Sequence, residues 1–242
     1  MIKIGCCGFC KAKQKYVKNF NLVEIQSTFY QPPSNLDTVR RWRQAVGGDF
    51  EFTIKMWQIA THLSSSPTYR RLKEFFGDKQ NYGFLRPTPE NIQAFRRIEE
   101  ICDVLGAKIV VFQTPPNFKE TEENINNMYK YFHKIKSKKL KFVWEERGGW
   151  SKDTLKKVCR DLKLVYCSDP FKNDFVYGDF IYWRLHGKGG YKYKYTLEDY
   201  KYLLSKIKEY KNKKDIYILF NNVFMCDDAL EFKEYLLKNK IL

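Results

Sequence analysis

The sequence predicts a single-domain α/β protein, a TIM-like barrel of parallel strands. Strand-like apolar runs alternate with helical stretches along the whole chain, and this alternation is typical of parallel sheets with right-handed crossover connections. About eight such units fit the 242 residues, a length at which (β/α)8 barrels fold as one unit. No shift in composition marks a second domain, so we assign residues 1–242 to one barrel.

Eight runs rich in apolar residues are expected to form the strands of this barrel. They cover residues 2–5, 22–27, 50–56, 108–113, 141–147, 164–168, 180–186 and 216–221. In the seventh run, Ile181, Trp183 and Leu185 share one face because side chains alternate along a strand. Arg184 and His186 share the other face, and a glycine-rich loop follows.

Helical stretches separate these strands, and several carry clear end signals. The expected helices cover residues 15–20, 37–46, 89–105, 122–135, 151–162, 196–208 and 227–238. Pro89 and Gly106 mark the two ends of the longest one, and Thr196 with Asp199 resembles a capping box. A long loop is expected at about 57–88 on the site face, with one short helix near 68–76.

Polar side chains gather where the expected strands end. The C-terminal ends of barrel strands build the active site, and buried polar groups are costly unless they pair or bind something. A rim of mutually satisfied ion pairs is the alternative interpretation. The candidate catalytic residues are Glu24, Lys55, Glu145 and His186, and the candidate substrate-binding residues include Gln26, Gln113, Arg147, Asp169, Arg184, Lys188, Asn221 and Asn222.

These residue types suit acid–base chemistry. Glu24 and Glu145 are two carboxylates on different strands, an arrangement used for proton transfer or glycoside chemistry. An imidazole titrates near neutral pH, so His186 could move protons. Lys55 suits a base of lowered pKa, a Schiff-base former or a simple phosphate contact.

The loop at 187–190 is expected to bind an anion. Its glycines permit a sharp turn with backbone N–H groups free to face a phosphate or sulfate. We expect that anion to lie between the loop and Arg184, with Lys188 adding charge and His186 close enough to donate a proton. Arg147 also suits a carboxylate or phosphate.

The net charge of +16 suggests an anionic partner, either a small molecule or nucleic acid. Many lysines lie at 134–141 and 208–214, however, which are expected helix ends on the face opposite the site. The basic and aromatic run at 188–195 could stack on bases and meet phosphates. Its tyrosines and lysines could equally pack and solvate a loop.

Seven cysteines lie at 6, 7, 10, 102, 159, 167 and 226. We expect all of them to be free thiols, with Cys6 or Cys7 near Cys226. We predict no cofactor. Cys6, Cys7, Cys10 and Cys226 are weak candidates for a thiolate metal site, because their spacing matches no common motif. The cysteines at 102 and 159 are expected in the core. No apolar run is long enough to span a membrane, and we expect a cytoplasmic protein without a signal peptide.

Several segments together resemble the YecE-like family, the domain of unknown function numbered 72, and in particular its archaeal branch. The motifs that carry the resemblance are IGCCGF at 4–9, VEIQSTFY at 23–30, FTIKMW at 52–57 with Thr61-His62, FQTPP at 112–116, WEER at 144–147, RLHG at 184–187 and FNN at 220–222. The resemblance implies a TIM-like barrel and adds His62 to the substrate-binding candidates. It supplies no reaction.

The leading functional hypothesis is an enzyme, a hydrolase, lyase or isomerase, that acts on an anionic and possibly phosphorylated or nucleic-acid-derived substrate. Similarly built barrels support this by analogy only. The alternatives are a nucleic-acid-binding module without catalysis and a thiolate protein holding zinc or an iron–sulfur cluster. The sequence gives no indication of the oligomeric state.

Overall fold

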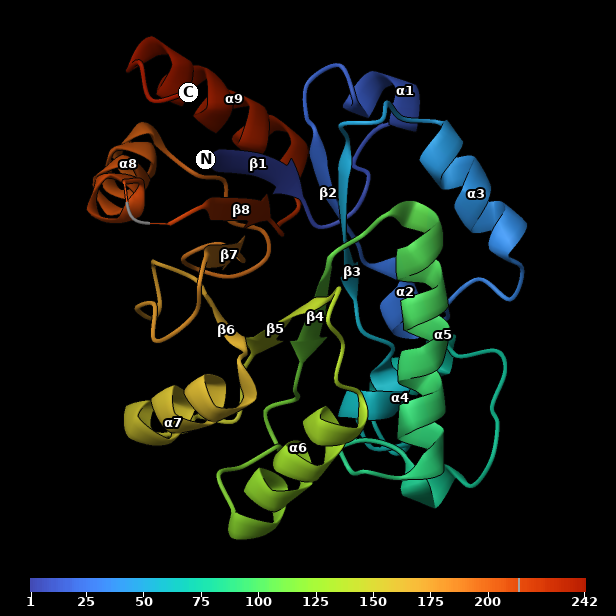
Figure 1. The fold of residues 1–242 in the computed structure, drawn as a ribbon. Helices are drawn as coiled ribbons and strands as arrows, with labels where there is room; N and C mark the ends of the chain where they lie inside the picture. The colour runs from blue at the N-terminus through green and yellow to red at the C-terminus, as the bar shows by residue number, and fades with distance from the viewer. Residues whose placement is uncertain (213) are drawn as a thin grey trace.

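The computed structural model describes residues 1–212 and 214–242, and its strands close into a barrel (Figure 1). Each strand pairs in parallel with the next, and the last pairs with the first. The strands are β1 (Ile2–Cys6), β2 (Leu22–Ile25), β3 (Glu51–Lys55), β4 (Ile109–Gln113), β5 (Lys141–Glu145), β6 (Val165–Ser168), β7 (Ile181–Leu185) and β8 (Ile216–Phe220). The predicted single-domain barrel is confirmed.

Helices surround the barrel, as Figure 1 shows. They are α1 (Lys13–Tyr16), α2 (Ser27–Tyr30), α3 (Leu36–Gln44), α4 (Gln58–Thr61), α5 (Pro89–Leu105), α6 (Glu122–Lys134), α7 (Lys152–Leu162), α8 (Leu197–Tyr210) and α9 (Met225–Lys238), with 3-10 turns η1 (Pro67–Arg71) and η2 (Lys79–Asn81). None of the described helices is long and apolar enough to cross a membrane.

The barrel closes where β1 and β8 meet. These strands run in register from Ile2 opposite Ile216 to Cys6 opposite Phe220. The N-terminal amine lies 2.7 Å from the Asp215 carboxylate just before β8, and α9 packs over both strands. The two ends of the chain are therefore held at the same seam.

Alternation along the strands divides the core into two apolar clusters. The larger cluster lies between strands and helices and contains Trp183 and Leu185 of β7. A smaller cluster contains the inward-facing residues of the barrel, among them Val143 and Tyr182. Arg184 follows Tyr182 on the inner face, as the two-residue period predicts. The inner apolar layers thus support a polar layer at the C-terminal strand ends.

Helix ends follow their sequence signals closely. Thr88 caps α5, Pro89 occupies its first turn, and Gly106 ends it with φ of 67°. The capping box between Thr196 and Asp199 at the start of α8 is present. The short helices α2 and α4 were not predicted, because four residues give no helical periodicity to recognise.

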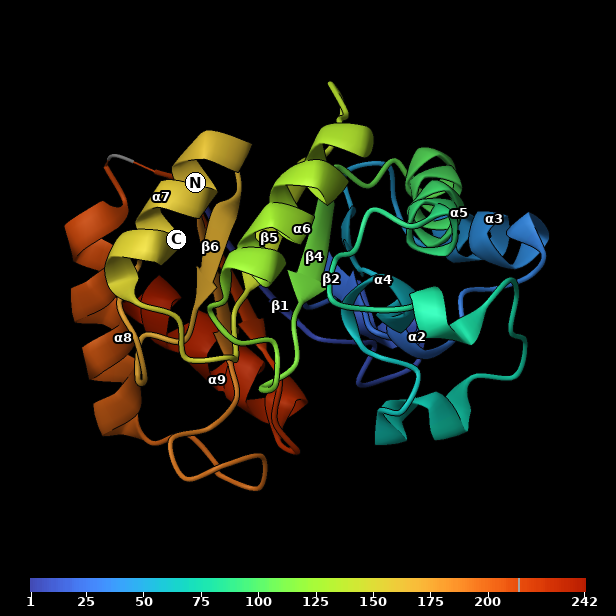
Figure 2. The same ribbon diagram turned by 90° about the horizontal axis from the view of Figure 1, so that it is seen from below.

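The segment between β3 and α5 is partly ordered by short turns. It holds α4, η1 and η2 in place of the single helix expected near 68–76, and Ser66 caps η1 just before Pro67. Figure 2 shows this segment and the loop after β7 extending from the same side of the molecule.

The lysine-rich connection between α6 and β5 leads into the N-terminal end of β5, away from the polar strand ends. The other lysine-rich segment, 208–214, leads from α8 toward β8. It includes residue 213, which lies outside the described residues.

Candidate functional site

Arg184 lies at the centre of the polar layer, on β7, with no exposed surface. Its Nη2 is 3.0 Å from Oε1 of Glu24, and its Nη1 donates to a Glu145 oxygen and, at 3.3 Å, to Oε1 of Gln113. Burial opposes its charge, but the two carboxylates outweigh burial and raise the pKa of Arg184 well above its ordinary value. Arg184 is therefore an ionised bridge across the barrel.

Glu24, from β2, is fixed on both oxygens. Its Oε2 accepts a hydrogen bond from the Tyr182 hydroxyl at 2.8 Å, and its Oε1 accepts one from the side chain of Gln26. Gln26 precedes α2, so this short helix positions it. These hydrogen bonds hold the Glu24 carboxylate inside the barrel.

Glu145 and Arg147 extend the charged layer outward from β5. Nε of Arg147 donates to Oε1 of Glu145 at 2.8 Å, and Nη2 of Arg147 lies 2.6 Å from the same oxygen. Burial alone would raise the pKa of Glu145. The guanidinium of Arg184, with that of Arg147, outweighs burial and holds the pKa well below its usual range.

His186 stands just beyond β7 between two acidic partners. Its backbone N–H donates to Oδ2 of Asp169 at 3.2 Å, and its Nδ1 lies 3.8 Å from the same oxygen. Its Nε2 lies 3.0 Å from Nη2 of Arg147 and 3.6 Å from Oε1 of Glu145. The imidazole is thus oriented from both sides and is 20% exposed.

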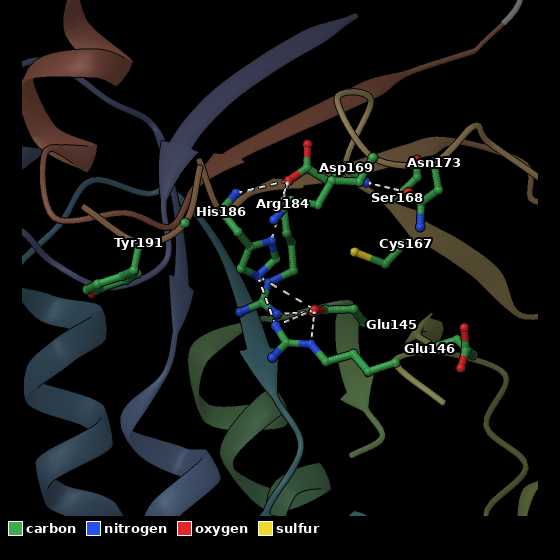
Figure 3. Close-up of a pocket in the computed structure, with 12 residues that line it drawn as sticks. Glu145, Glu146, Cys167, Ser168, Asp169, Asn173, Arg184, His186 and Tyr191 are labelled. Atoms are coloured by element: carbon green, nitrogen blue, oxygen red, sulfur yellow. Dashed lines mark hydrogen bonds and ion pairs between the residues drawn. The ribbon is translucent and has the colours of Figure 1, made fainter. Parts of the chain in front are cut away.

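A cavity of about 400 Å³ opens over β5, β6 and β7 (Figure 3). It is lined by Glu145, Glu146, Arg147, Cys167, Ser168, Asp169, Lys172, Asn173, Arg184, His186, Gly190 and Tyr191. Five of these are predicted site residues. The sequence does not indicate Lys172 and Asn173 because the loop after β6 carries no motif, and it indicates Tyr191 only as part of a basic and aromatic run.

Lys55 and His62 are buried outside this cavity, against the ring of Phe29. Nζ of Lys55 lies 4.0 Å from the ring centroid, and burial, helped by the Arg184 charge, lowers the pKa of Lys55 to about 7. Nδ1 of His62 lies 2.8 Å from the Thr61 hydroxyl. Burial and then the Lys55 charge lower the pKa of His62 to about 3, so its imidazole is neutral at neutral pH.

The glycine-rich loop makes polar contacts of its own where free anion-binding groups were expected. The Gly187 N–H donates to the Tyr195 hydroxyl at 2.8 Å, and the Lys188 ammonium pairs with Asp199 at 2.9 Å. Because Arg184 is wholly buried and bridged to carboxylates, we correct the expectation that an anion lies between it and this loop.

The asparagines after β8 occupy structural positions. The Asn222 side chain donates to the Tyr193 carbonyl at 2.7 Å and to Asp228 at 2.6 Å. The backbone N–H of Asn221 donates to the Leu185 carbonyl at 2.9 Å. Neither residue lines the cavity.

The cysteines depart from the expected free thiols. Cys10 and Cys226 form a disulfide between the β1–α1 loop and α9. Cys6 lies beside it, with its sulfur 3.8 Å from that of Cys10. Cys7 belongs instead to the apolar cluster inside the barrel. The four candidate thiolates are therefore not gathered as ligands, and the described residues contain no cluster of three or more groups suited to a metal.

Comparison with known proteins assigns the chain to a family. The family model described as "Protein of unknown function DUF72" matches residues 11–240. A DUF72 protein (EF0366) of Enterococcus faecalis V583 has a similar structure, with 18% identity, 98% of each chain covered and a TM-score of 0.74.

Two further structures share the fold at lower similarity. The UV damage endonuclease SacUVDE is 10% identical, with 100% of this chain and 99% of that chain covered and a TM-score of 0.61. A D-tagatose 3-epimerase-like protein is 15% identical, with 99% and 98% covered and a TM-score of 0.61. No curated protein matches the chain. The match over residues 11–240 establishes that this chain is a member of the DUF72 family, the YecE-like proteins.

Proposed function

We propose that the chain is an enzyme that performs acid–base chemistry on an anionic substrate in the cavity over β5, β6 and β7. The observation that carries the proposal is the position of His186. Its imidazole lines an open cavity between the Asp169 carboxylate and the Arg147–Glu145 pair. An imidazole held in this way can accept a proton at one nitrogen while an acid orients the other.

Two cationic side chains at the cavity bind the anion. The Arg147 side chain is 37% exposed while it pairs with Glu145. The Lys172 side chain is 46% exposed, with its Nζ 3.8 Å from Asp169. Both can reach a phosphate or carboxylate in the cavity, where charge-assisted hydrogen bonds are the strong ones.

The buried charges behind the cavity act as positioning residues. Glu24 and Glu145 hold the Arg184 guanidinium, and Arg147 in turn is held by Glu145. Lys55, with its pKa lowered to about 7, is the second candidate for proton transfer, because a neutral amine is a base. Lys55 is buried and does not line the cavity.

Isomerisation, elimination and hydrolysis all fit this set of residues. The fold likeness to an epimerase-like protein and to an endonuclease suggests sugar phosphates and nucleic-acid fragments as the substrates to test first. We do not propose the thiolate-metal alternative, because two of its four ligands form a disulfide. Membership of the archaeal branch and a cytoplasmic location stay predictions.

A substrate panel in D2O tests the proposal. It contains dihydroxyacetone phosphate, ribose 5-phosphate and an oligonucleotide with one abasic site. NMR detects deuterium incorporated next to a carbonyl, and gel electrophoresis detects strand cleavage. We expect turnover of at least one compound by the wild-type protein and none by His186→Gln. Binding of the oligonucleotide without any turnover would instead support a nucleic-acid-binding module.

A further inference from the structure

An exposed apolar surface adjoins the cavity mouth, and the proposed reaction does not use it. Tyr191, in the loop after β7, is 57% exposed, and Val223, in the turn after β8, is 54% exposed. The Val223 N–H donates to the Tyr191 carbonyl at 2.9 Å, so the two residues are neighbours. Phe224 follows and is also exposed. We call Tyr191, Val223 and Phe224 the Tyr191 ledge.

Polar contacts hold the loop that carries Tyr191 in place, whereas the Tyr191 side chain itself is exposed. Lys188 and the Tyr193 hydroxyl both bind Asp199, and the Asn222 side chain donates to the Tyr193 carbonyl. Within the described part of the chain, the Tyr191 hydroxyl has no hydrogen-bond partner and its ring has no aromatic neighbour. Figure 3 shows it apart from the bonded network of His186. An exposed aromatic ring on an anchored loop is available to a ligand.

Other tyrosines of the same run are already engaged. Tyr193 binds Asp199, and the Tyr195 ring is buried against Phe171 and Phe220. The broad expectation that residues 188–195 bind nucleic acid therefore narrows to Tyr191 and its exposed neighbour Lys192.

Positively charged side chains lie close to the ledge. Arg147 and Lys172 line the same cavity as Tyr191, and Lys192 is exposed without a salt bridge to the described residues. We propose that the Tyr191 ledge stacks unpaired bases of a single-stranded nucleic acid whose phosphate enters the cavity at Arg147 and Lys172. This rests on the proposed function and names its substrate class.

A single-stranded nucleic acid fits this surface better than a free nucleotide does. One base covers one aromatic ring, whereas the ledge continues from Tyr191 through Val223 to Phe224. Aromatic platforms beside cations are the usual means of holding successive bases without sequence preference. The net charge of +16 also favours a polyanion over a single phosphate.

Three ligands of increasing size separate the contributions of phosphate, base and strand. Calorimetry with the 242-residue protein compares ribose 5-phosphate, thymidine 5′-monophosphate and a single-stranded oligothymidylate six nucleotides long. The variants are Tyr191→Ala, Tyr191→Phe and Arg147→Ala. Phe75→Ala is the control, because Phe75 is an exposed aromatic residue that does not line the cavity.

We expect Tyr191→Ala to weaken oligothymidylate binding by about fivefold to 150-fold, the loss typical of one stacked base. Ribose 5-phosphate binding should not change, and Tyr191→Phe and Phe75→Ala should bind the oligonucleotide like the wild type. Arg147→Ala should weaken all three ligands.

Two results would overturn the inference while leaving the proposed function intact. One is oligothymidylate binding that Tyr191→Ala leaves unchanged. The other is binding of the mononucleotide as tight as that of the oligonucleotide, which would assign the ledge to a free nucleotide. Failure of every ligand to bind the wild type would instead reject anion binding by the cavity itself.

Discussion

The Nη2 atom of Arg184 lies 3.0 Å from Oε1 of Glu24, and neither side chain has exposed surface. An ion pair withdrawn from water in this way is stable only while both partners remain. Arg184 is therefore part of the barrel's internal structure, and a substrate anion must bind to other cationic side chains. We therefore expect the anion to contact Arg147 and not Arg184.

Arg184→Met should destabilise the protein strongly. It leaves Glu24 and Glu145 as buried carboxylates without their shared partner, which costs about 3–5 kcal/mol. Urea unfolding measures the loss. Arg147→Met is the control and should change stability by no more than about 1 kcal/mol, because its side chain is partly exposed. Equal stability of the two variants would contradict a structural role for Arg184.

Arg147→Ala should reduce affinity for anions with little effect on folding. The lost charge-assisted contact is worth about 1.5–3 kcal/mol, or roughly tenfold to 150-fold in Kd. Calorimetry with ribose 5-phosphate checks this. Arg160→Ala, which removes an exposed arginine of α7, should bind like the wild type. A normal Kd for Arg147→Ala would place the anion elsewhere.

Lys55→Met should stabilise the protein near pH 6. The buried ammonium loses its proton near pH 7 in the folded chain, whereas an ordinary lysine keeps its proton to about 10.5. Between these values the unfolded chain binds more protons, so wild-type stability rises with pH across this window. Below pH 7 the folded wild type carries the full cost of burying the Lys55 ammonium. Removing this cost should raise the free energy of unfolding by roughly 3–5 kcal/mol.

The gain from Lys55→Met should shrink by about 1.4 kcal/mol per pH unit between pH 7 and pH 10. Urea unfolding at several pH values measures it, with Lys192→Met as an exposed control. A pH-independent difference, or a loss of stability at pH 6, would show that Lys55 is not a desolvated cation.

Reduction of the disulfide should weaken the barrel at its seam. Cys10 and Cys226 are 216 positions apart in the chain, so the link restricts the unfolded chain substantially and should contribute about 2–5 kcal/mol. Thermal unfolding with and without dithiothreitol measures this, and Cys10→Ser should be insensitive to the reductant. Seven titratable thiols in the untreated protein would contradict the link.

Sequence alone predicts the barrel because its strands and helices each carry local signals. Capping residues, glycines at helix ends and the alternation of β7 all describe structure within a few residues of themselves. The strand ends were also identifiable, since parallel strands of a barrel present their C-terminal ends together.

The pairing of side chains within the site could not be predicted in the same way. Arg184 and Lys188 look alike as cations near one strand end, and only three-dimensional packing shows that Arg184 bridges Glu24 and Glu145 while Lys188 binds Asp199. The disulfide likewise joins residues at opposite ends of the chain, and the loop after β6 has no pattern that marks Lys172.

The most direct test of the proposed acid–base role compares His186→Gln with His133→Gln. His133 is an exposed histidine of α6 outside the cavity. The measurement is kcat/KM for the substrate that the D2O panel identifies. Loss of the proton-transfer group should lower kcat/KM by about 100-fold to 10,000-fold in His186→Gln, with wild-type values in His133→Gln and unchanged unfolding in both. Wild-type kcat/KM in a folded His186→Gln protein would contradict the assignment of proton transfer to His186.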